Sequence, residues 1–267
     1  MSQVKAIPMH LITYQLIKYP FGYKVEYDGK QALFIPREHV ITTRLSVQTH
    51  PTNPVVKLPA TYTLHPLNPD RQAEYIATFF AVFKNTVEFC AWSPSGVHQT
   101  AVNHIEGFFA GKRGQPHPAS VMTLQTDGST DTNGSLAGLA LVVTNTFGET
   151  ELDLLYVMPD SQRRQVAHAM LQHILKHLRQ TGEETLRSTR HICNEASRNW
   201  HAAMGFQDDY DWLYVRLKCA WYQREIWRHL QLGWTDELEN LQSKLAYWRE
   251  LEEHFKKSRI LAANHLP

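Results

Sequence analysis

Two acidic residues, Glu151 and Asp153, lie two positions apart in a segment that otherwise carries leucines. In a β-strand, residues two apart point to the same face of the sheet, so the two carboxylates should be neighbours. Like charges at close range raise the pKa of one partner towards neutrality, which suits a general base. The alternatives are two surface charges, or two carboxylates that bind a substrate cation without proton transfer.

A basic turn follows the same segment. Pro159 ends the expected strand, and Arg163 and Arg164 precede an amphipathic helix that begins near Val166. A helix N-terminus presents unpaired backbone N–H groups and a partial positive charge, which together favour phosphate. The arginines add cationic donors. These features predict an anion site at the helix start, against the alternative of an ordinary strand-turn-helix with solvated arginines.

The elements that position these residues follow the order β-α-α-β-β-β-α-β-α-β. No GxGxxG or GxxxxGK[ST] run is present, which disfavours Rossmann and P-loop nucleotide sites. Hydrophobic periodicity and turn residues define the expected elements. The expected strands are 62–65, 120–124, 136–143, 150–157, 185–192 and 211–217, and the expected helices begin near residues 68, 95, 166 and 195.

The basic turn resembles the pyrophosphate loop of the Gcn5-related N-acetyltransferase (GNAT) family. That loop reads Arg/Gln-x-x-Gly-x-Gly/Ala and begins three residues after a proline that ends a strand. This chain has Gln162-Arg-Arg-Gln-Val-Ala167 in the same register after Pro159. Gln165 stands where the family usually has glycine, which lets the backbone approach phosphate closely. Gln165 can still donate its backbone N–H if the turn keeps ordinary helical angles.

A second segment is similar to the family's Asn-x-x-Ala-x-x-Leu-Tyr-x-x-x-Gly-Phe motif. Asn194, Gly205 and Phe206 are in the expected register. Asn194 should cap a helix, Gly205 permits a left-handed helix end, and Phe206 should fill the core. The resemblance also implies that Asn194 lies near the pantetheine arm of the cofactor. In all, it covers roughly residues 60 to 218.

The resemblance implies an α/β fold of the α+β kind, a GNAT fold with a mixed, mostly antiparallel sheet flanked by helices. It implies acetyl-CoA, or a close acyl-CoA relative, as cosubstrate, and direct transfer of the acyl group to a small-molecule or peptide amine. It implies no metal. The residues expected against the cofactor are Leu155, Tyr156, Val157, Gln162, Arg163, Arg164, Gln165, Val166, Ala167 and Asn194.

Amine acylation needs a base for the ammonium and an acid for the leaving thiolate. Glu151 lies eleven residues before Gln162, where some family members carry a general-base glutamate, and Asp153 is the second candidate. His201 occupies the register of the family's acid tyrosine, four residues before Gly205. An imidazolium could protonate the thiolate, because its ordinary pKa is near neutral. The alternative is that His201 is a solvent-facing helix residue.

Extensions flank the expected acyltransferase domain, which we place at residues 59–220. Residues 1–58 are predicted to be β-rich, with strands on both sides of the turn signal Asp28-Gly29. A proline-rich linker is predicted at 50–59. Residues 221–267 are predicted to be helical, because apolar residues recur along the tail after Thr235. This helix must cover its own domain, the N-terminal extension or a second subunit, so a homodimer is one alternative.

Composition narrows the classes of protein. The 267 residues carry a formal net charge of +1 and three cysteines. Near-neutral charge disfavours nucleic-acid and membrane-surface partners, and the odd, scattered cysteines favour the reducing cytoplasm. No signal peptide or membrane span is expected. His173 and His177 sit one helical turn apart, but no third metal ligand is evident nearby.

Two functions from different classes fit the sequence. The first is an acyl-CoA-dependent N-acyltransferase. The alternative is an acyl-CoA-binding regulatory or interaction protein with degraded catalysis, suggested by Gln165 and by His201 in place of the tyrosine.

Overall fold

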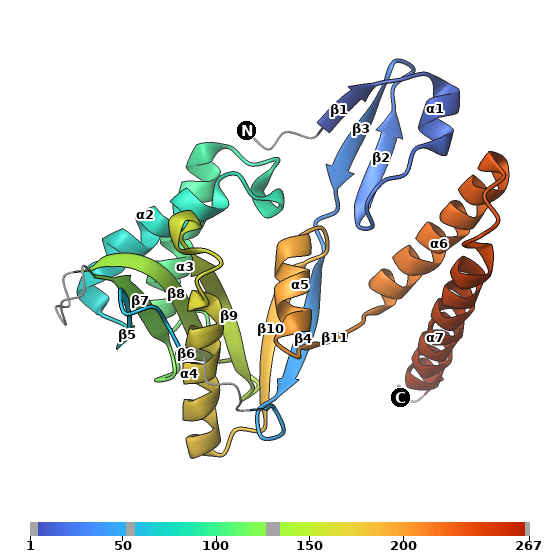
Figure 1. The fold of residues 1–267 in the computed structure, drawn as a ribbon. Helices are drawn as coiled ribbons and strands as arrows, with labels where there is room; N and C mark the ends of the chain where they lie inside the picture. The colour runs from blue at the N-terminus through green and yellow to red at the C-terminus, as the bar shows by residue number, and fades with distance from the viewer. Residues whose placement is uncertain (1–4, 52–56, 127–133, 265–267) are drawn as a thin grey trace. The chain divides into compact units, whose positions relative to one another are not determined.

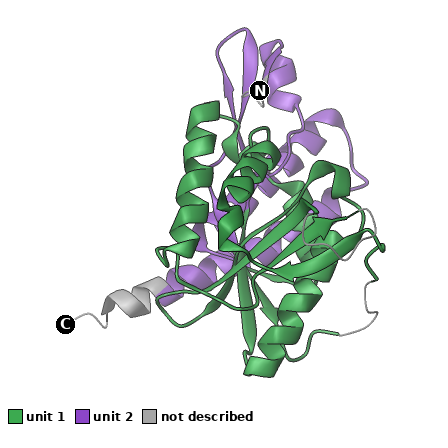
Figure 2. Ribbon diagram, turned by 90° about the vertical axis from the view of Figure 1, so that its left-hand side faces the viewer, with its two compact units in different colours: residues 1–3, 42–190, 194–208 green, residues 4–41, 191–193, 209–267 purple. Residues whose placement is uncertain are grey.

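The computed structural model describes residues 5–51, 57–126 and 134–264. The chain forms two compact units (Figure 2). Among the described residues, unit 1 takes 42–190 and 194–208, and unit 2 takes 5–41, 191–193 and 209–264. Unit 1 contains most of the expected acyltransferase domain. The three parts predicted from the sequence, with limits near residues 58 and 220, stay a prediction, because these units divide the chain elsewhere.

The main sheet has the strand order β11-β4-β10-β9-β8-β7-β5, with β6 paired to β8 (Figure 1). The pair β9–β10 is parallel, whereas β5–β7, β7–β8 and β8–β9 are antiparallel. The strands are β4 (Val40–Ser46), β5 (Tyr62–Pro66), β6 (Gln115–Pro116), β7 (Val121–Gln125), β8 (Ser135–Thr144), β9 (Thr150–Val157), β10 (Thr185–His191) and β11 (Gln207–Asp209).

Helices bury both faces of this sheet. On one face lies α4 (Val166–Thr181), whose Met170, Ile174 and Leu178 are fully buried. On the other face lie α2 (Gln72–Phe83) and α3 (Pro94–Phe109). Along β8, Ala140 and Val142 pack with the α4 cluster, whereas Leu139 and Leu141 pack with the α2–α3 cluster. Burial on both faces explains why β8 is a continuous apolar run rather than an alternating one.

Short helical turns and caps define how these helices start. The turn η1 (Pro69–Arg71) precedes α2, and the Asn68 side chain accepts a hydrogen bond from the backbone N–H of Asp70, as the sequence predicts. The turn η2 (Val87–Phe89) joins α2 to α3. The helix α5 (Glu195–Ala203) follows β10. The expected order of elements from residue 60 to α5 is therefore confirmed.

The last expected strand, 211–217, is wrong. Residues Trp212–Leu232 form the helix α6, and Asp211 caps it by accepting a hydrogen bond from the backbone N–H of Tyr214 at 2.7 Å. The alternation of aromatic and polar residues there is short, and the capping aspartate decides the outcome because it satisfies a first-turn donor. The strand that does follow α5 is the three-residue β11.

Unit 2 contains a small antiparallel sheet, order β1-β3-β2, and two long helices. Its elements are β1 (Lys5–Pro8), α1 (Leu11–Leu16), β2 (Tyr23–Tyr27), β3 (Gln31–Pro36), α6 and α7 (Leu238–Asn264). The predicted hairpin around Asp28-Gly29 is confirmed. The tail stripe is also explained within the chain: Leu241, Leu245 and Trp248 are buried, and Trp248 contacts the ring of Tyr214 on α6.

Two predicted loops fall partly outside the described residues. The proline-rich linker at 50–59 includes 52–56, and the polar loop at 126–135 includes 127–133.

Candidate active site

The turn between β9 and α4 has an unusual backbone. After η3 (Pro159–Ser161), Arg163 and Gln165 adopt the left-handed region, with φ of 61° and 66°. Among the described non-glycine residues, these are the two with positive φ. Each costs on the order of 1–3 kcal/mol, which the surrounding structure must offset. Gln165 therefore does not keep ordinary helical angles, and its left-handed conformation is the one that explains glycine at this position in the family motif.

This backbone leaves donors at the helix start without a cap. Gln165 is the N-cap of α4, and no side chain caps the helix. The first N–H groups of α4, at Val166, Ala167 and His168, have no intrahelical acceptor. Alternating φ signs through Arg163, Arg164 and Gln165 turn successive N–H groups into one concavity, the arrangement that binds anions.

The side chains of the turn are exposed to solvent, so a ligand can reach them. Gln162, Arg163, Arg164 and Gln165 are all exposed. The Gln162 amide donates to the carbonyl oxygen of Val157 at 3.3 Å. Two exposed guanidinium groups therefore flank an uncapped helix start, and this combination suits a pyrophosphate better than a lone carboxylate.

Strands β9 and β10 separate immediately before this turn. Their pairing comprises Glu151 opposite Arg187 and Leu152 opposite Ser188. On its other edge β9 stays paired with β8 as far as Val157. The register on that edge shifts between Leu154 and Leu152, so Asp153 forms a bulge at the point where the strands part. The β10 side of β9 from Asp153 to Val157 is thus an open strand edge that can pair with an extended ligand.

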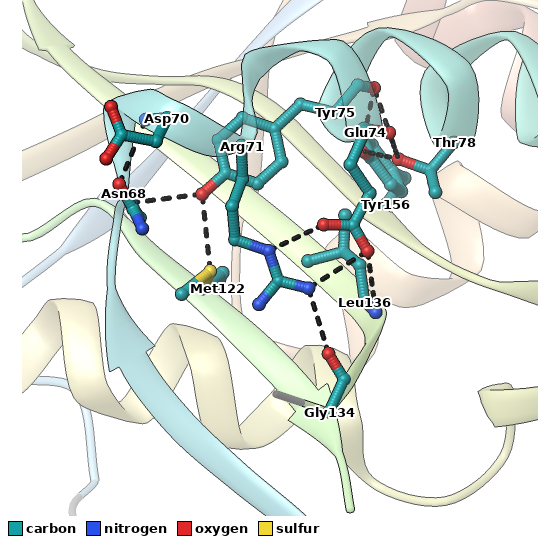
Figure 3. Close-up of polar contacts among 10 residues, drawn as sticks. All are labelled: Asn68, Asp70, Arg71, Glu74, Tyr75, Thr78, Met122, Gly134, Leu136 and Tyr156. Carbon is teal, nitrogen blue, oxygen red and sulfur yellow. Dashed lines mark hydrogen bonds and ion pairs between the residues drawn. The ribbon is translucent and has the colours of Figure 1, made fainter. Parts of the chain in front are cut away.

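Tyr156 contributes backbone rather than side chain to this edge. Its hydroxyl lies 2.7 Å from Thr78 Oγ1 and donates to the carbonyl oxygen of Tyr75 at 3.3 Å (Figure 3). Figure 3 shows the ring among residues of α2, where Arg71 and Glu74 also tie the helix to β8. Burial raises the pKa of Tyr156 well above its ordinary value, so this phenol is a poor proton donor.

Glu151 and Asp153 share a face, as predicted, but their surroundings differ. Burial raises the pKa of Glu151, and the negative charge of Asp153 raises it further. Asn145 and Arg113 oppose this rise without cancelling it. A half-buried glutamate with a raised pKa is a suitable proton acceptor near neutral pH.

Asp153 is held by two cationic side chains. Arg113 donates to both carboxylate oxygens, at 2.8 and 2.6 Å, and His104 Nε2 lies 2.9 Å from Oδ2. Burial alone would raise the pKa of Asp153, but Arg113 and His104 lower it to about 2. Such a carboxylate accepts protons poorly, which favours a supporting role for Asp153. The sequence did not indicate His104 or Arg113, because both lie at least forty residues from Asp153 along the chain.

His201 is buried, with 5% of its surface exposed, so the solvent-facing alternative is wrong. Its Nδ1 lies 2.8 Å from the carbonyl oxygen of Ser197, and its Nε2 lies 3.1 Å from Ser188 Oγ. When the neutral ring donates a hydrogen bond from Nδ1, its Nε2 accepts a hydrogen bond from the Ser188 hydroxyl. Burial lowers the pKa of His201. The ring therefore stands beside Ser188, where the two strands part, but both of its nitrogens are already engaged.

The second motif forms the opposite rim of the opening. Asn194 caps α5 by accepting the backbone N–H of Ser197 at 2.9 Å, as predicted. Gly205 has φ +80° at the helix end, and Phe206 is buried in the α4 cluster, also as predicted. The sequence did not indicate that the Asn194 amide would donate to Glu88 Oε1, a residue of η2.

Comparison with known proteins agrees with this geometry. A family model described as the acetyltransferase (GNAT) family matches residues 88–206, a range that holds β9, β10, α4, α5 and both motifs. This part of the chain is therefore similar to the GNAT acetyltransferase family, and the sheet and helices form an α+β GNAT fold with an added N-terminal sheet and C-terminal helices.

Several solved structures are similar to this chain. A GCN5-related N-acetyltransferase from Sphaerobacter thermophilus is 12% identical, with a TM-score of 0.46 over 64% of this chain and 48% of that one. A tandem GNAT protein from the clavulanic acid biosynthesis pathway is 15% identical, with a TM-score of 0.44 over 63% and 50%. An aminoglycoside N-acetyltransferase solved with CoA is 12% identical, with a TM-score of 0.38 over 56% and 90%.

The matched part of this chain spans about half the length of the first two of those proteins. No curated protein matches the chain. Within the described ranges, no helix combines the length and apolar character needed to cross a bilayer.

Proposed function

We propose that this protein is an acyl-CoA-dependent N-acyltransferase that transfers an acetyl group from acetyl-CoA to a primary amine by direct attack. The observation that carries the proposal is the start of α4, where uncapped backbone donors and two left-handed residues follow an open strand edge. In the proposal, the N–H groups from Arg164 to Ala167 bind the pyrophosphate, and the edge from Leu155 to Val157 pairs with the pantetheine arm.

Glu151 is the proposed base. The acceptor ammonium gives a proton to the Glu151 carboxylate, and the free amine then attacks the thioester carbonyl. A C–N bond forms, the C–S bond breaks, the nitrogen loses its remaining extra proton to solvent, and the CoA thiolate leaves and takes up a proton. A glutamate with a raised pKa accepts this proton more readily than an ordinary glutamate does. Backbone N–H groups near the Asp153 bulge can stabilise the oxyanion that forms on the carbonyl.

His201 remains the proposed acid, acting beside Ser188. The position of the pair at the parting of β9 and β10 supports this role, since the thioester would lie there. The buried, neutral ring would have to charge before it donates a proton, so we expect this step to contribute less than the base.

Two measurements in sequence test the proposal. Calorimetric titration should show saturable binding of acetyl-CoA, and a thiol-release assay over a panel of amines should then show turnover. Binding without thiol release on any amine would instead support the second candidate. That candidate is an acyl-CoA-binding regulatory protein, and it is favoured by one observation: both nitrogens of His201 are hydrogen-bonded inside the protein.

The proposal extends to the setting of the reaction. The acceptor is a small-molecule or peptide amine, and no metal takes part. A cytoplasmic location is supported by three scattered cysteines. The proposal includes a homodimer, and the molar mass from light scattering tests it.

A further inference from the structure

Glu88 has one carboxylate oxygen that nothing in the described chain satisfies. Oε1 accepts a hydrogen bond from the Asn194 amide, but Oε2 is buried and has no hydrogen-bond partner among the described residues. Burying an ionised carboxylate oxygen without a partner costs free energy, so native proteins rarely do it without a reason. The natural partner of such an oxygen is a cation, or a donor that a ligand supplies.

Glu88 connects the α2–α3 turn to the helix that follows β10. It lies on η2, and Asn194, its partner, begins α5 just after β10. On the β9 side, the ring of Phe89 contacts Phe83, whose own ring contacts Tyr156 near the end of β9. The turn η2 is therefore linked to the start of α5 through Glu88 and, through Phe89 and Phe83, to the Tyr156 side chain of β9.

Glu88 and Glu151 are linked to different points along the chain of β10 and α5. Glu151 lies at the closed end, next to Leu152, which faces Ser188. From Ser188, β10 continues three residues to His191, and Asn194 lies three residues beyond. At about 3.3 Å per residue, the strand from Ser188 to His191 alone spans on the order of 10 Å, so the residues linked to the two carboxylates are well separated along β10. The two carboxylates therefore suit two different groups on one acceptor.

We propose that Glu88 binds a second positively charged group of the acceptor, at a distance from the amine that is acylated. This inference rests on the proposed acyl transfer and adds the substrate class: amines with two cationic groups joined by an extended chain. An ammonium group offers three donors, and one of them would satisfy Oε2 while Asn194 keeps Oε1 in place.

The test is calorimetric titration of straight-chain diamines, each against the monoamine of the same length, into protein saturated with CoA. A diamine of matching length should bind at least about tenfold more tightly than its monoamine, since it gains one charge-assisted hydrogen bond. Glu88→Gln should remove this preference and leave the affinity for CoA unchanged. The matched control is Glu184→Gln, which makes the same charge change at an exposed residue at the other end of β10.

Equal binding of diamines and monoamines by the wild-type protein would overturn the inference. So would a Glu88→Gln variant that weakens both equally, or that weakens CoA instead. A thiol-release assay with acetyl-CoA distinguishes failure of the Glu88 site from failure of the proposed acyl transfer. If diamines bind through Glu88 but no amine releases thiol, the acyl transfer fails and the Glu88 site stands. If amines release thiol without a diamine preference, the Glu88 site fails and the acyl transfer stands.

Discussion

Strand β9 carries carboxylates at its amino-terminal end and leads into uncapped backbone donors at its carboxyl-terminal end. At the first end, the properties of Glu151 and Asp153 depend on the side chains around them, since Arg113 and His104 hold one carboxylate and not the other. At the second end, the site depends on backbone angles, at Arg163 and Gln165, with little help from side-chain capping.

This difference implies that binding and chemistry can be separated by mutation. Changes of side chain at the amino-terminal end should alter turnover or stability and leave acetyl-CoA affinity intact. Changes of charge or backbone freedom at the α4 start should alter affinity and leave the chemical step intact. The predictions below test that separation, beginning with the largest expected effect.

Glu151→Gln should lower the turnover of acetyl-CoA and amine by about 100-fold or more, the usual contribution of a general base. Acetyl-CoA affinity by calorimetry should stay within about twofold. Because the pKa of Glu151 is raised, wild-type turnover should fall on the acid side at a higher pH than an ordinary glutamate would give. Full activity in the variant would show that Glu151 is not the base. So would a variant whose turnover falls at the same acid pH as that of the wild-type protein.

Asp153→Asn should lower the free energy of unfolding by about 2 kcal/mol at neutral pH, because the lowered pKa measures the stabilisation of the ionised form. The folded pKa, about 2, lies below the ordinary 3.8, so this stabilisation is present above pH 4 and is lost as the pH falls towards 2. Urea unfolding of both proteins checks this. A variant of normal stability with no turnover would instead make Asp153 part of the chemistry.

Gln165→Asp should weaken acetyl-CoA binding by about 10- to 100-fold, because it adds a negative charge beside the proposed pyrophosphate site. Gln165→Asn is the matched control: it has nearly the same shape, tolerates positive φ and adds no charge, so its affinity should stay near the wild-type value. Turnover at saturating acetyl-CoA should be similar in both variants. Equal affinities of the two variants would show that the pyrophosphate binds elsewhere.

Gln165→Gly should stabilise the protein by about 0.5–1 kcal/mol, since relief of the left-handed strain exceeds the added freedom of the unfolded chain. Arg164→Gly, at a neighbouring position without positive φ, should destabilise it. Thermal unfolding of the two variants compares them directly. Destabilisation in both would mean that Gln165 carries no strain.

Local sequence signals predicted most of the fold. Asn68, Asn194 and Asp28-Gly29 each satisfy backbone donors or a turn within a few residues, so their effects can be read from the chain. The wrong strand at 211–217 had the same origin, because Asp211 is a capping residue whose signal competes with a short aromatic alternation.

The site was less predictable, because its properties depend on contacts between distant residues. Glu151 and Asp153 have the same residue class and the same face, but Arg113 and His104 give them opposite pKa shifts. The Nε2 atom of His201 is hydrogen-bonded to Ser188, and the side-chain amide of Asn194 is hydrogen-bonded to Glu88. No periodicity or motif in one sequence reports such pairs.

The central claim is that acyl-CoA binds at the start of α4 along the open edge of β9. The most direct test is a titration with acetyl-CoA followed by backbone amide chemical shifts. We predict saturable changes that are largest at residues 163–168 and extend along 153–157. Saturable binding that leaves those amides unmoved, or no binding at all, would contradict the account.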